Sequence, residues 1–382
     1  MADFSLKISP NITLGSYSST RLGQFVREWG TRYMLIMDPV LNESGAAEKI
    51  KVSLTDRNID YFTFEELPSS PDSSILERAI NLARDAHIHG VITAGGEKAG
   101  NLGRAVAALY HEANNLYEYV DGATPTTSPL PCICLPTTIK DEFLFSDRIP
   151  VIDGRTRQLK LMKSPSGLVK LALFDPNLTV SLTENQTASL AIQTLCMAVE
   201  CYLSQKSNFF SDTICEKAIE LLSSGMDGSP TLSNATPPEQ FLMQGGCMTS
   251  LAAGISSVGP ASLLALTIGA RYRLPRSTIA SILFPYVIED AARFKTERLA
   301  NVARIMQVAS DTTSSETAAT ALADNIRNRL AMANLPARLK DLNISIEQLS
   351  LAAEDAGQLE MINAMPRSMT ADDLFDFIKQ AY

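Results

Sequence analysis

The chain has 382 residues, of which 45% are hydrophobic and 20% charged, and its formal net charge is −9 at pH 7. This length is enough for one large or two ordinary domains with a substantial core, and the composition is typical of soluble globular enzymes. The acidic balance argues against a general nucleic-acid binder and against a protein that binds anionic membranes, so we expect neither as a partner.

The six cysteines form no CxxC pair, and a chain this long does not need disulfide bonds for stability. We expect buried thiols in a reducing cytosol, hence a cytoplasmic protein. The first residues, MADFSLKISPN, lack the basic-then-apolar pattern of a secretion signal. The uncharged run Leu242–Ala270 is interrupted by glycines and a proline, which favours two buried helices over a membrane span.

In the first half of the chain, short apolar runs alternate with amphipathic segments. Strands are predicted at residues 8–15, 32–37, 60–63, 90–93, 131–138 and 171–174, and helices at 20–30, 45–55, 70–87 and 101–110. Residues 147–163 are predicted to form a hairpin that turns at Asp153-Gly154. The alternation is typical of a parallel sheet with helices on both faces, as in Rossmann-like α/β domains.

The second half is predicted to be helical. Helices are expected at residues 183–204, 212–224, 238–257, 261–272, 276–294, 295–309, 315–333, 345–355 and 370–381. Capping residues stand at Thr183, Ser345 and Thr370, each followed three residues later by a polar partner. We therefore predict an α/β nucleotide-binding domain at 1–180 and a helical domain at 181–382.

The segment VITAGGEKAGNLGRAVA, residues 91–107, combines a buried strand, a glycine turn and a helix. Unpaired backbone N–H groups and the helix dipole make such a junction an anion site, so Gly95 and Gly96 are interpreted as a cradle for a nucleotide diphosphate. The alternative is an ordinary turn in which Glu97 simply satisfies the helix dipole.

Asp38 ends the strand at 32–37, ahead of the glycine turn. An acid at such a position of a dinucleotide site often binds ribose hydroxyls and disfavours a 2′-phosphate. The alternative is a turn or N-cap role, which Asp before Pro39 also suits.

The order of these segments resembles the iron-containing alcohol dehydrogenase family, within the wider dehydroquinate-synthase-like fold. GGEKAGN (95–101) stands where the family has GGGSPID, and PTTIKDEFLFS (136–146) where it has PTTAGTGSEVT. FDPNLTVSLTENQTA (174–188) is similar to the family's DPELTLTLP…TA segment, and LPRSTIASILFPYV (274–287) to VPHGLANAILLPYV. The resemblance covers nearly the whole chain and implies an α/β domain followed by an all-α domain.

The resemblance also implies an NAD(H) or NADP(H) site. Its residues would be Asp38, Gly95, Gly96, Glu97, Lys98, Asn101, Thr137, Thr138 and Lys140. Glu97 replaces the third glycine of the family cradle, and Lys140 to Phe143 replace the small GTGS loop. A carboxylate facing a diphosphate would weaken binding unless it turns outward. Lys140 could still hold a phosphate, although the neighbouring acids offset its charge.

The family holds a divalent metal with one Asp and three His. The corresponding positions here are Gln193, Met197, Ser262 and Arg276, and the three histidines of the chain all lie in its first half. An amide, a thioether, a hydroxyl and a guanidinium are poor ligands for Fe²⁺ or Zn²⁺. We therefore expect no divalent metal.

Two functional hypotheses remain open. In the first, the protein is a metal-independent, NAD(P)-linked oxidoreductase for a small, anionic alcohol or carbonyl compound bound in an interdomain cleft. Arg276 would replace the metal as the electrophile, with Lys160 of the hairpin as a second cation. Arg276 could equally be a solvated residue near a helix end, together with Arg271 and Arg273.

In the second hypothesis, the chain is a catalytically silent homologue, or an enzyme with non-redox chemistry. Loss of all four metal ligands and sequence changes in both cofactor-binding loops would be expected if the active site had lost its function, and also if it had acquired a new reaction. The frequent dimerisation of the family leads us to expect a homodimer or a higher homo-oligomer.

Overall fold

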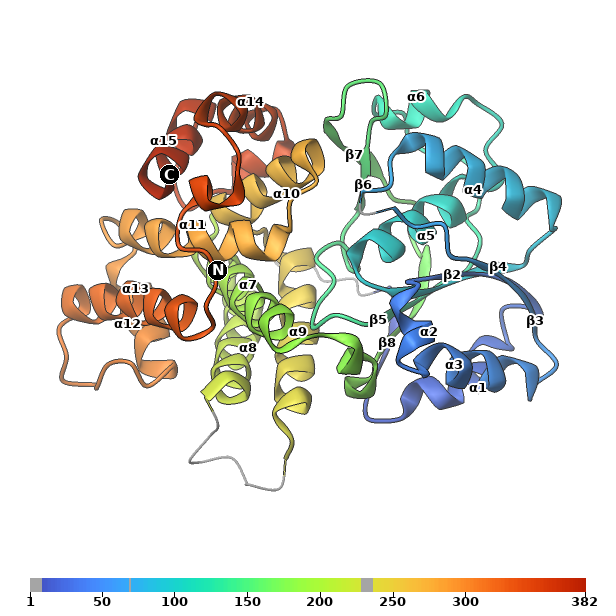
Figure 1. Ribbon diagram of the computed structural model, residues 1–382, viewed down its shortest axis with the longest axis horizontal. Helices are drawn as coiled ribbons and strands as arrows, with labels where there is room; N and C mark the ends of the chain where they lie inside the picture. Colours follow the sequence, from blue (N-terminus) through green and yellow to red (C-terminus); the bar gives the residue numbers. More distant parts are fainter. Residues whose placement is uncertain (1–8, 69, 228–235) are drawn as a thin grey trace. The chain divides into compact units, whose positions relative to one another are not determined.

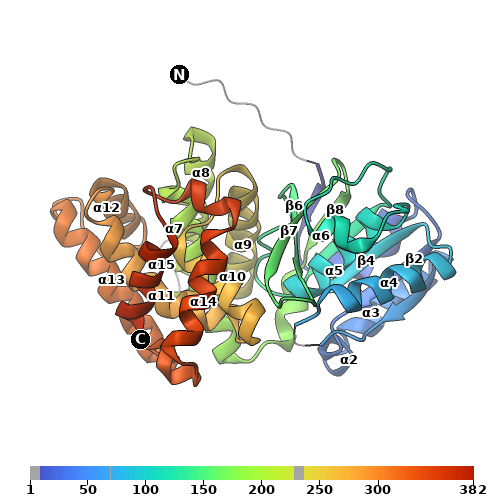
Figure 2. The same ribbon diagram turned by 90° about the horizontal axis from the view of Figure 1, so that it is seen from above.

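The computed structural model describes residues 9–68, 70–227 and 236–382. The chain divides into two units, Met1–Leu182 and Thr183–Tyr382 (Figure 1). All the strands of the described residues belong to the first unit, and the second consists of helices and their connections (Figure 2). The expected fold class, an α/β domain followed by an all-α domain, is confirmed.

The first unit is built on a six-stranded parallel sheet. Its strands are β1 (Asn11–Leu14), β2 (Arg32–Met37), β3 (Asp60–Phe64), β4 (Gly90–Gly95), β5 (Cys132–Pro136) and β8 (Val169–Phe174), in the order β1-β8-β5-β4-β2-β3. From β2 the chain first adds β3 on one side and then β4 on the other. This reversal makes the carboxyl ends of β2 and β4 the topological switch point, where α/β sheets bind ligands.

Helices cover both faces of this sheet. They are α1 (Leu22–Val26), α2 (Val40–Glu43), α3 (Ala46–Thr55), α4 (Ser73–Asp85), α5 (Glu97–Leu109) and α6 (Leu116–Val120), with 3-10 turns at η1 (Ser18–Arg21) and η2 (Pro176–Ser181). The predicted hairpin is formed by β6 (Arg148–Ile152) and β7 (Leu159–Lys163).

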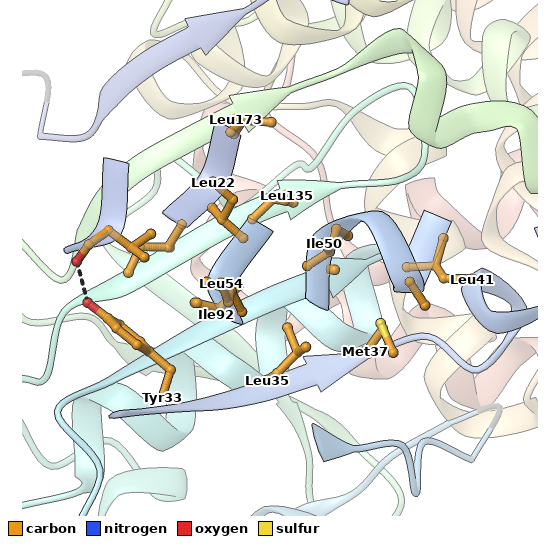
Figure 3. Close-up of a cluster of buried hydrophobic side chains, with 14 of the residues drawn as sticks. Leu22, Tyr33, Leu35, Met37, Leu41, Ile50, Leu54, Ile92, Leu135 and Leu173 are labelled. Carbon is orange, nitrogen blue, oxygen red and sulfur yellow. Dashed lines mark hydrogen bonds between the residues drawn. The ribbon is translucent and has the colours of Figure 1, made fainter. Parts of the chain in front are cut away.

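The core of the first unit lies between one face of the sheet and helices α1 to α3 (Figure 3). Alternate residues of β2, namely Tyr33, Leu35 and Met37, face this cluster, because successive side chains of a strand point to opposite faces. The buried Tyr33 hydroxyl donates a hydrogen bond to the carbonyl of Val26 at 2.6 Å. On the opposite face, a Cβ on Gly103 of α5 would lie 2.0 Å from Cγ2 of Thr93.

Two helix predictions for the first unit need correction, and two short helices were missed. Helix α5 begins at Glu97, not at 101, because Gly96 is extended (φ −74°, ψ −173°) and the helix starts directly after it. The helix predicted at 20–30 is a 3-10 turn followed by α1, which ends at Val26. The short helices α2 and α6 were not predicted, because one turn of helix shows no periodicity.

The second unit contains nine described α-helices. They are α7 (Glu184–Leu203), α8 (Phe209–Asp227), α9 (Pro238–Ile255), α10 (Pro260–Tyr272), α11 (Arg276–Ala291), α12 (Thr296–Ile305), α13 (Ser315–Met332), α14 (Ile346–Gly357) and α15 (Ala371–Ala381). Short 3-10 turns occur at η3 (Leu339–Leu342) and η4 (Glu360–Ala364). Thr183, Ser345 and Thr370 each form the predicted capping box.

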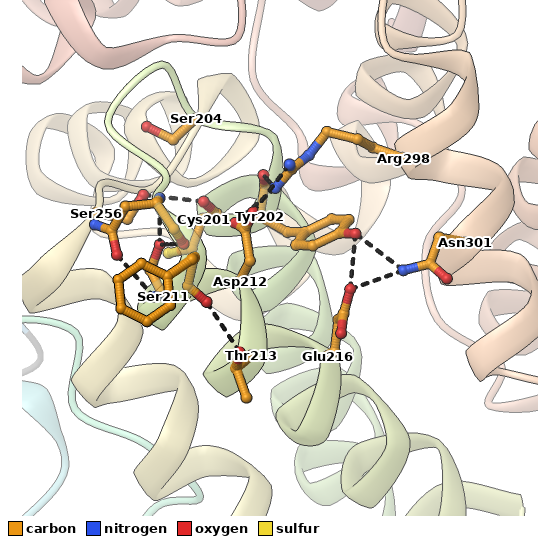
Figure 4. A network of polar contacts seen from close by, with 12 residues as sticks. Cys201, Tyr202, Ser204, Ser211, Asp212, Thr213, Glu216, Ser256, Arg298 and Asn301 are labelled. Atoms are coloured by element: carbon orange, nitrogen blue, oxygen red, sulfur yellow. Dashed lines mark hydrogen bonds and ion pairs between the residues drawn. The ribbon is translucent and has the colours of Figure 1, made fainter. Parts of the chain in front are cut away.

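A polar network joins the end of α7 to α8 and α12 (Figure 4). Arg298 forms a two-pronged ion pair with Asp212, at 3.0 and 2.6 Å, and its guanidinium carbon lies 3.8 Å from the centre of the Tyr202 ring. The Tyr202 hydroxyl and the Asn301 amide both donate to Glu216, each at 2.9 Å. These contacts fix the C-terminal end of α7, the helix that carries two of the four former metal positions.

Residues 242–270, predicted as two buried helices, form most of α9 and most of α10. No single helix in the described part of the chain has the length and hydropathy to cross a membrane; α9 and α10 have them only as a pair bent by 94°. All six cysteines are buried and free of disulfide bonds.

Candidate functional site

The candidate cofactor site lies where β2 and β4 end side by side. Met37 and Ala94 are register partners, so Asp38 and Gly95 follow them at the same edge of the sheet. The backbone N–H of Asp38 donates to the carbonyl of Ala94 at 2.9 Å, and its carboxylate accepts the N–H of Gly96 at 3.4 Å. The structure therefore brings together two residues that the sequence analysis assigned to one site from separate segments.

The glycine turn packs closely against its neighbours. Gly96 is the N-cap of α5 and supplies no side chain to cap it. A Cβ on Gly95 would lie 2.7 Å from Cβ of Ala99, and one on Gly96 would lie 3.3 Å from the methyl group of Thr138. A side chain at Gly95 would therefore clash with Ala99, and one at Gly96 would press against Thr138. A helix N-terminus approached through glycine fits a diphosphate.

Glu97, in the first turn of α5, does not add an uncompensated negative charge to this cradle. Its carboxylate forms an ion pair with the ammonium group of Lys140, which is only 1% exposed. The two residues at which the chain departs most from the family pattern thus neutralise each other. Lys140 is a buried partner of Glu97 and not an exposed lysine free to bind a phosphate, and its role towards a cofactor stays a prediction.

A second ion pair is formed by the next residue of the same loop, Asp141. Arg104 contacts both carboxylate oxygens of Asp141, at 2.7 and 3.0 Å, and donates to the amide oxygen of Asn101 at 2.5 Å. Gly100 is required for this contact, since a Cβ there would lie 2.6 Å from Oδ2 of Asp141. Asn101, predicted as a cofactor residue, is buried and its amide oxygen accepts the hydrogen bond from Arg104. In this structure it therefore holds Arg104 in place.

The remaining predicted residues lie at the same edge. Thr137 donates its backbone N–H to the carbonyl of Gly95 at 3.0 Å and is buried. Thr138 turns its methyl group towards Gly96 and donates its hydroxyl to the carbonyl of Lys140 at 2.9 Å. The ammonium group of Lys98 lies 3.2 Å from the carboxylate of Asp38.

The positions of the family's metal ligands lie in the second unit. Gln193 and Met197 are buried on α7, Ser262 is buried near the start of α10, and Arg276 begins α11. The side chain of Arg276 packs along α10, because a Cβ on Gly269 would lie 2.8 Å from its Cγ.

This donor set does not fit the family metal. Among the residues that the structure describes, no three His, Cys, Asp or Glu side chains are grouped as metal ligands. The four side chains at the ligand positions offer an amide, a thioether, a hydroxyl and a cation. The absence of a bound metal nevertheless stays a prediction.

The sequence analysis missed Glu200, which lies on α7 one turn beyond Met197. Its fully buried carboxylate accepts the backbone N–H of Ala261 at 2.7 Å and that of Ser262 at 3.3 Å. Burial raises the pKa of Glu200 to about 7, in spite of these hydrogen bonds, which lower it. An acid inside an otherwise apolar stretch of a predicted buried helix was the available signal.

The other predicted cations have different surroundings. Lys160 is half-buried on β7 of the first unit, and its charge helps to lower the pKa of Asp153, for which the hydrogen bond from Arg155 is the larger cause. Arg271 is held by Asp355 through contacts of 2.7 and 2.9 Å. Arg273 is the left-handed C-cap of α10. Arg271 and Arg273 therefore have local structural roles.

Comparison with known proteins agrees with this architecture. Two family models match the chain: "Iron-containing alcohol dehydrogenase" over residues 9–176 and "Fe-containing alcohol dehydrogenase family, C-terminal" over residues 187–382. The 1,3-propanediol dehydrogenase of Citrobacter freundii is 22% identical over 356 residues, 92% of this chain and 92% of that protein.

Two solved structures illustrate the similarity of the fold. That of 1,3-propanediol oxidoreductase superposes with a TM-score of 0.90 at 20% identity, over 98% of this chain and 99% of that one. The structure of sulfoacetaldehyde reductase from Bifidobacterium kashiwanohense, in complex with NAD⁺, superposes with a TM-score of 0.85 at 17% identity. The match covers 100% of this chain and 99% of that one. Fold and site define a two-unit protein of the alcohol-oxidoreductase type. The chain belongs to the iron-containing alcohol dehydrogenase family.

Proposed function

We propose that this protein is a metal-independent, NAD(P)-linked oxidoreductase that acts on a small anionic alcohol or carbonyl compound. The observation that carries the proposal is the glycine turn at the start of α5, where the N-cap residue offers no side chain and where the acids Glu97 and Asp38 are each paired with a lysine, Lys140 and Lys98. A structural neighbour that binds NAD⁺ and is named for an anionic aldehyde supports both parts. The cytoplasmic location and homo-oligomeric state stay predictions.

In this proposal each residue has a defined task. The backbone of Gly95 and Gly96 and the N-terminus of α5 bind the diphosphate, and Asp38 accepts hydrogen bonds from ribose hydroxyls. The bound nicotinamide supplies the hydride chemistry. Arg276, at a former metal position, binds the anionic group of the substrate or stabilises its reacting oxygen, because a guanidinium holds oxyanions in bidentate fashion.

A second candidate function is that of a silent homologue that binds no dinucleotide. The specific observation in its favour is that the carboxylate of Asp38 already accepts the N–H of Gly96, while a second acid, Glu97, stands in the first turn of α5. In this case the protein itself would supply the anion that the helix N-terminus favours.

Titration of the protein with NADH, followed by nucleotide fluorescence, separates the two candidates. We expect NADH to bind the wild type saturably. Gly96→Val should lower the affinity for NADH by about tenfold or more, because the new side chain stands where the diphosphate would bind. The φ of −74° at Gly96 is accessible to any residue, so the variant should fold. Gly15→Ala is the matched control, since nothing lies within 4 Å of a Cβ there. Absence of NADH binding to the wild type would support the silent homologue.

A further inference from the structure

An ion pair at the mouth of the cradle involves the residue expected to choose between NAD and NADP. Asp38 follows β2, and its side chain is 15% exposed. Lys98 is the second residue of α5, and its side chain is 34% exposed. The ammonium nitrogen lies 3.2 Å from one carboxylate oxygen of Asp38, and the other oxygen accepts the N–H of Gly96.

An acid in the position of Asp38 disfavours NADP(H) for two reasons. It competes with the 2′-phosphate for space, and its negative charge repels that of the phosphate. The repulsion is felt in full only when the carboxylate has no nearby cation. Here the ammonium of Lys98 compensates the charge of Asp38 at contact distance.

Lys98 can also offer its charge to a ligand. Unlike Lys140, which is buried against Glu97, Lys98 is partly exposed and stands in the first turn of α5, where the helix dipole also favours an anion. In dinucleotide sites that accept NADP, a cation near the end of the second strand accommodates the 2′-phosphate. The side chain of Lys98 lies at that place in this chain, although it comes from another element.

We propose that Lys98 is a specificity-determining residue: it neutralises Asp38 and pairs with the 2′-phosphate, so that the cradle accepts NADP(H) as well as NAD(H). This inference rests on the proposed function, because it presupposes a dinucleotide in the cradle. Asp38 then keeps its role towards the ribose hydroxyls of NAD(H), and with NADP(H) the ammonium group of Lys98 stands between the carboxylate of Asp38 and the 2′-phosphate and pairs with both.

The test is a pair of equilibrium titrations, with NADH and with NADPH, at one ionic strength. We expect the wild type to bind both with dissociation constants within about tenfold of each other. Lys98→Gln should weaken NADPH binding by about tenfold or more and change NADH binding by less than about threefold. Lys163→Gln is the charge-matched control, since Lys163 is exposed on β7 and donates a hydrogen bond to the hydroxyl of Thr124 at 3.0 Å.

Asp38→Asn provides an independent second variant, which should strengthen NADPH binding and weaken NADH binding. Two outcomes would overturn the inference while leaving the proposed function intact. In one, Lys98→Gln weakens both nucleotides equally, so that Lys98 contacts the shared diphosphate. In the other, the wild type binds NADH but discriminates against NADPH by about a hundredfold or more. Failure of the wild type to bind either nucleotide would remove the proposed function itself.

Discussion

At the scale of single residues, Glu200 has the most unusual environment. Its carboxyl group is enclosed between α7 and the first turn of α10, and a Cβ on Gly259 would lie 2.9 Å from it. Burial raises its pKa to about 7, against an ordinary value of 4.5. Between these two values the folded protein holds a proton that the unfolded chain has lost. Stability must therefore decrease as the pH rises through this window.

This linkage predicts a specific pH dependence. Glu200 should contribute about 3 kcal/mol to the loss of unfolding free energy between pH 4.5 and pH 8. Glu200→Gln keeps an oxygen for the N–H of Ala261 but cannot ionise. As the pH rises, the unfolding free energy of the wild type should therefore fall relative to that of the variant. Urea unfolding at a series of pH values measures this. A difference that is constant from pH 5 to pH 8 would contradict the assignment.

The residue-level predictions from sequence had a clear physical limit. Capping residues such as Thr183 and Ser345 could be identified because their partners are three residues away. The pairing of Glu97 with Lys140 could not, since 43 positions separate them and only the fold brings them together. From the sequence, Glu97 was expected to weaken diphosphate binding, whereas in the structure Lys140 neutralises its charge.

At the scale of elements, α5 and the segment after β5 form a matched pair. Glu97 and Arg104, two turns apart on one face of α5, hold the consecutive residues Lys140 and Asp141. Gly100 lies between them and admits the second carboxylate. The departures from the family's cradle and from its GTGS loop are therefore mutually compensating, and they are better explained as one structural change than as two.

The first of these ion pairs can be tested by a double-mutant cycle on NADH binding. Lys140→Met leaves the Glu97 carboxylate without this partner at the helix start, and should weaken NADH binding by about tenfold or more. Glu97→Gln combined with Lys140→Met should restore it to near the wild-type value. If the double variant binds as weakly as Lys140→Met, then Lys140 contacts the nucleotide directly and the compensation argument is wrong.

The same region shows why one element boundary was mispredicted. Helix α5 was expected at residues 101–110, after a turn made by Gly95 and Gly96. The helix in fact includes Gly100, whose low helix propensity is outweighed by the close approach of Asp141. The long helices α7 and α13 were predicted to within a residue or two, because long segments are the most reliable to assign and a capping residue marks where α7 begins.

At the scale of the whole molecule, the strand order of the first unit explains why Asp38 and Gly96 share a site. The alternation of strands and helices predicted a parallel sheet, but the reversal between β2 and β4 follows only from the observed order. The second unit keeps the family's helices while its four ligand positions carry side chains that do not suit a metal. Family membership therefore predicts the fold fully and the chemistry only in part.

The central claim, hydride transfer without a metal, is tested most directly by NADH oxidation with small anionic aldehydes after chelator treatment. The metal content of the same sample is measured. We expect undiminished turnover in protein with less than about one-tenth of a metal ion per chain, since the ligand positions lack metal donors. Arg276→Ala should abolish turnover without loss of fold. Activity that disappears on chelation and returns with Fe²⁺ or Zn²⁺ would contradict the account, as would the absence of turnover throughout.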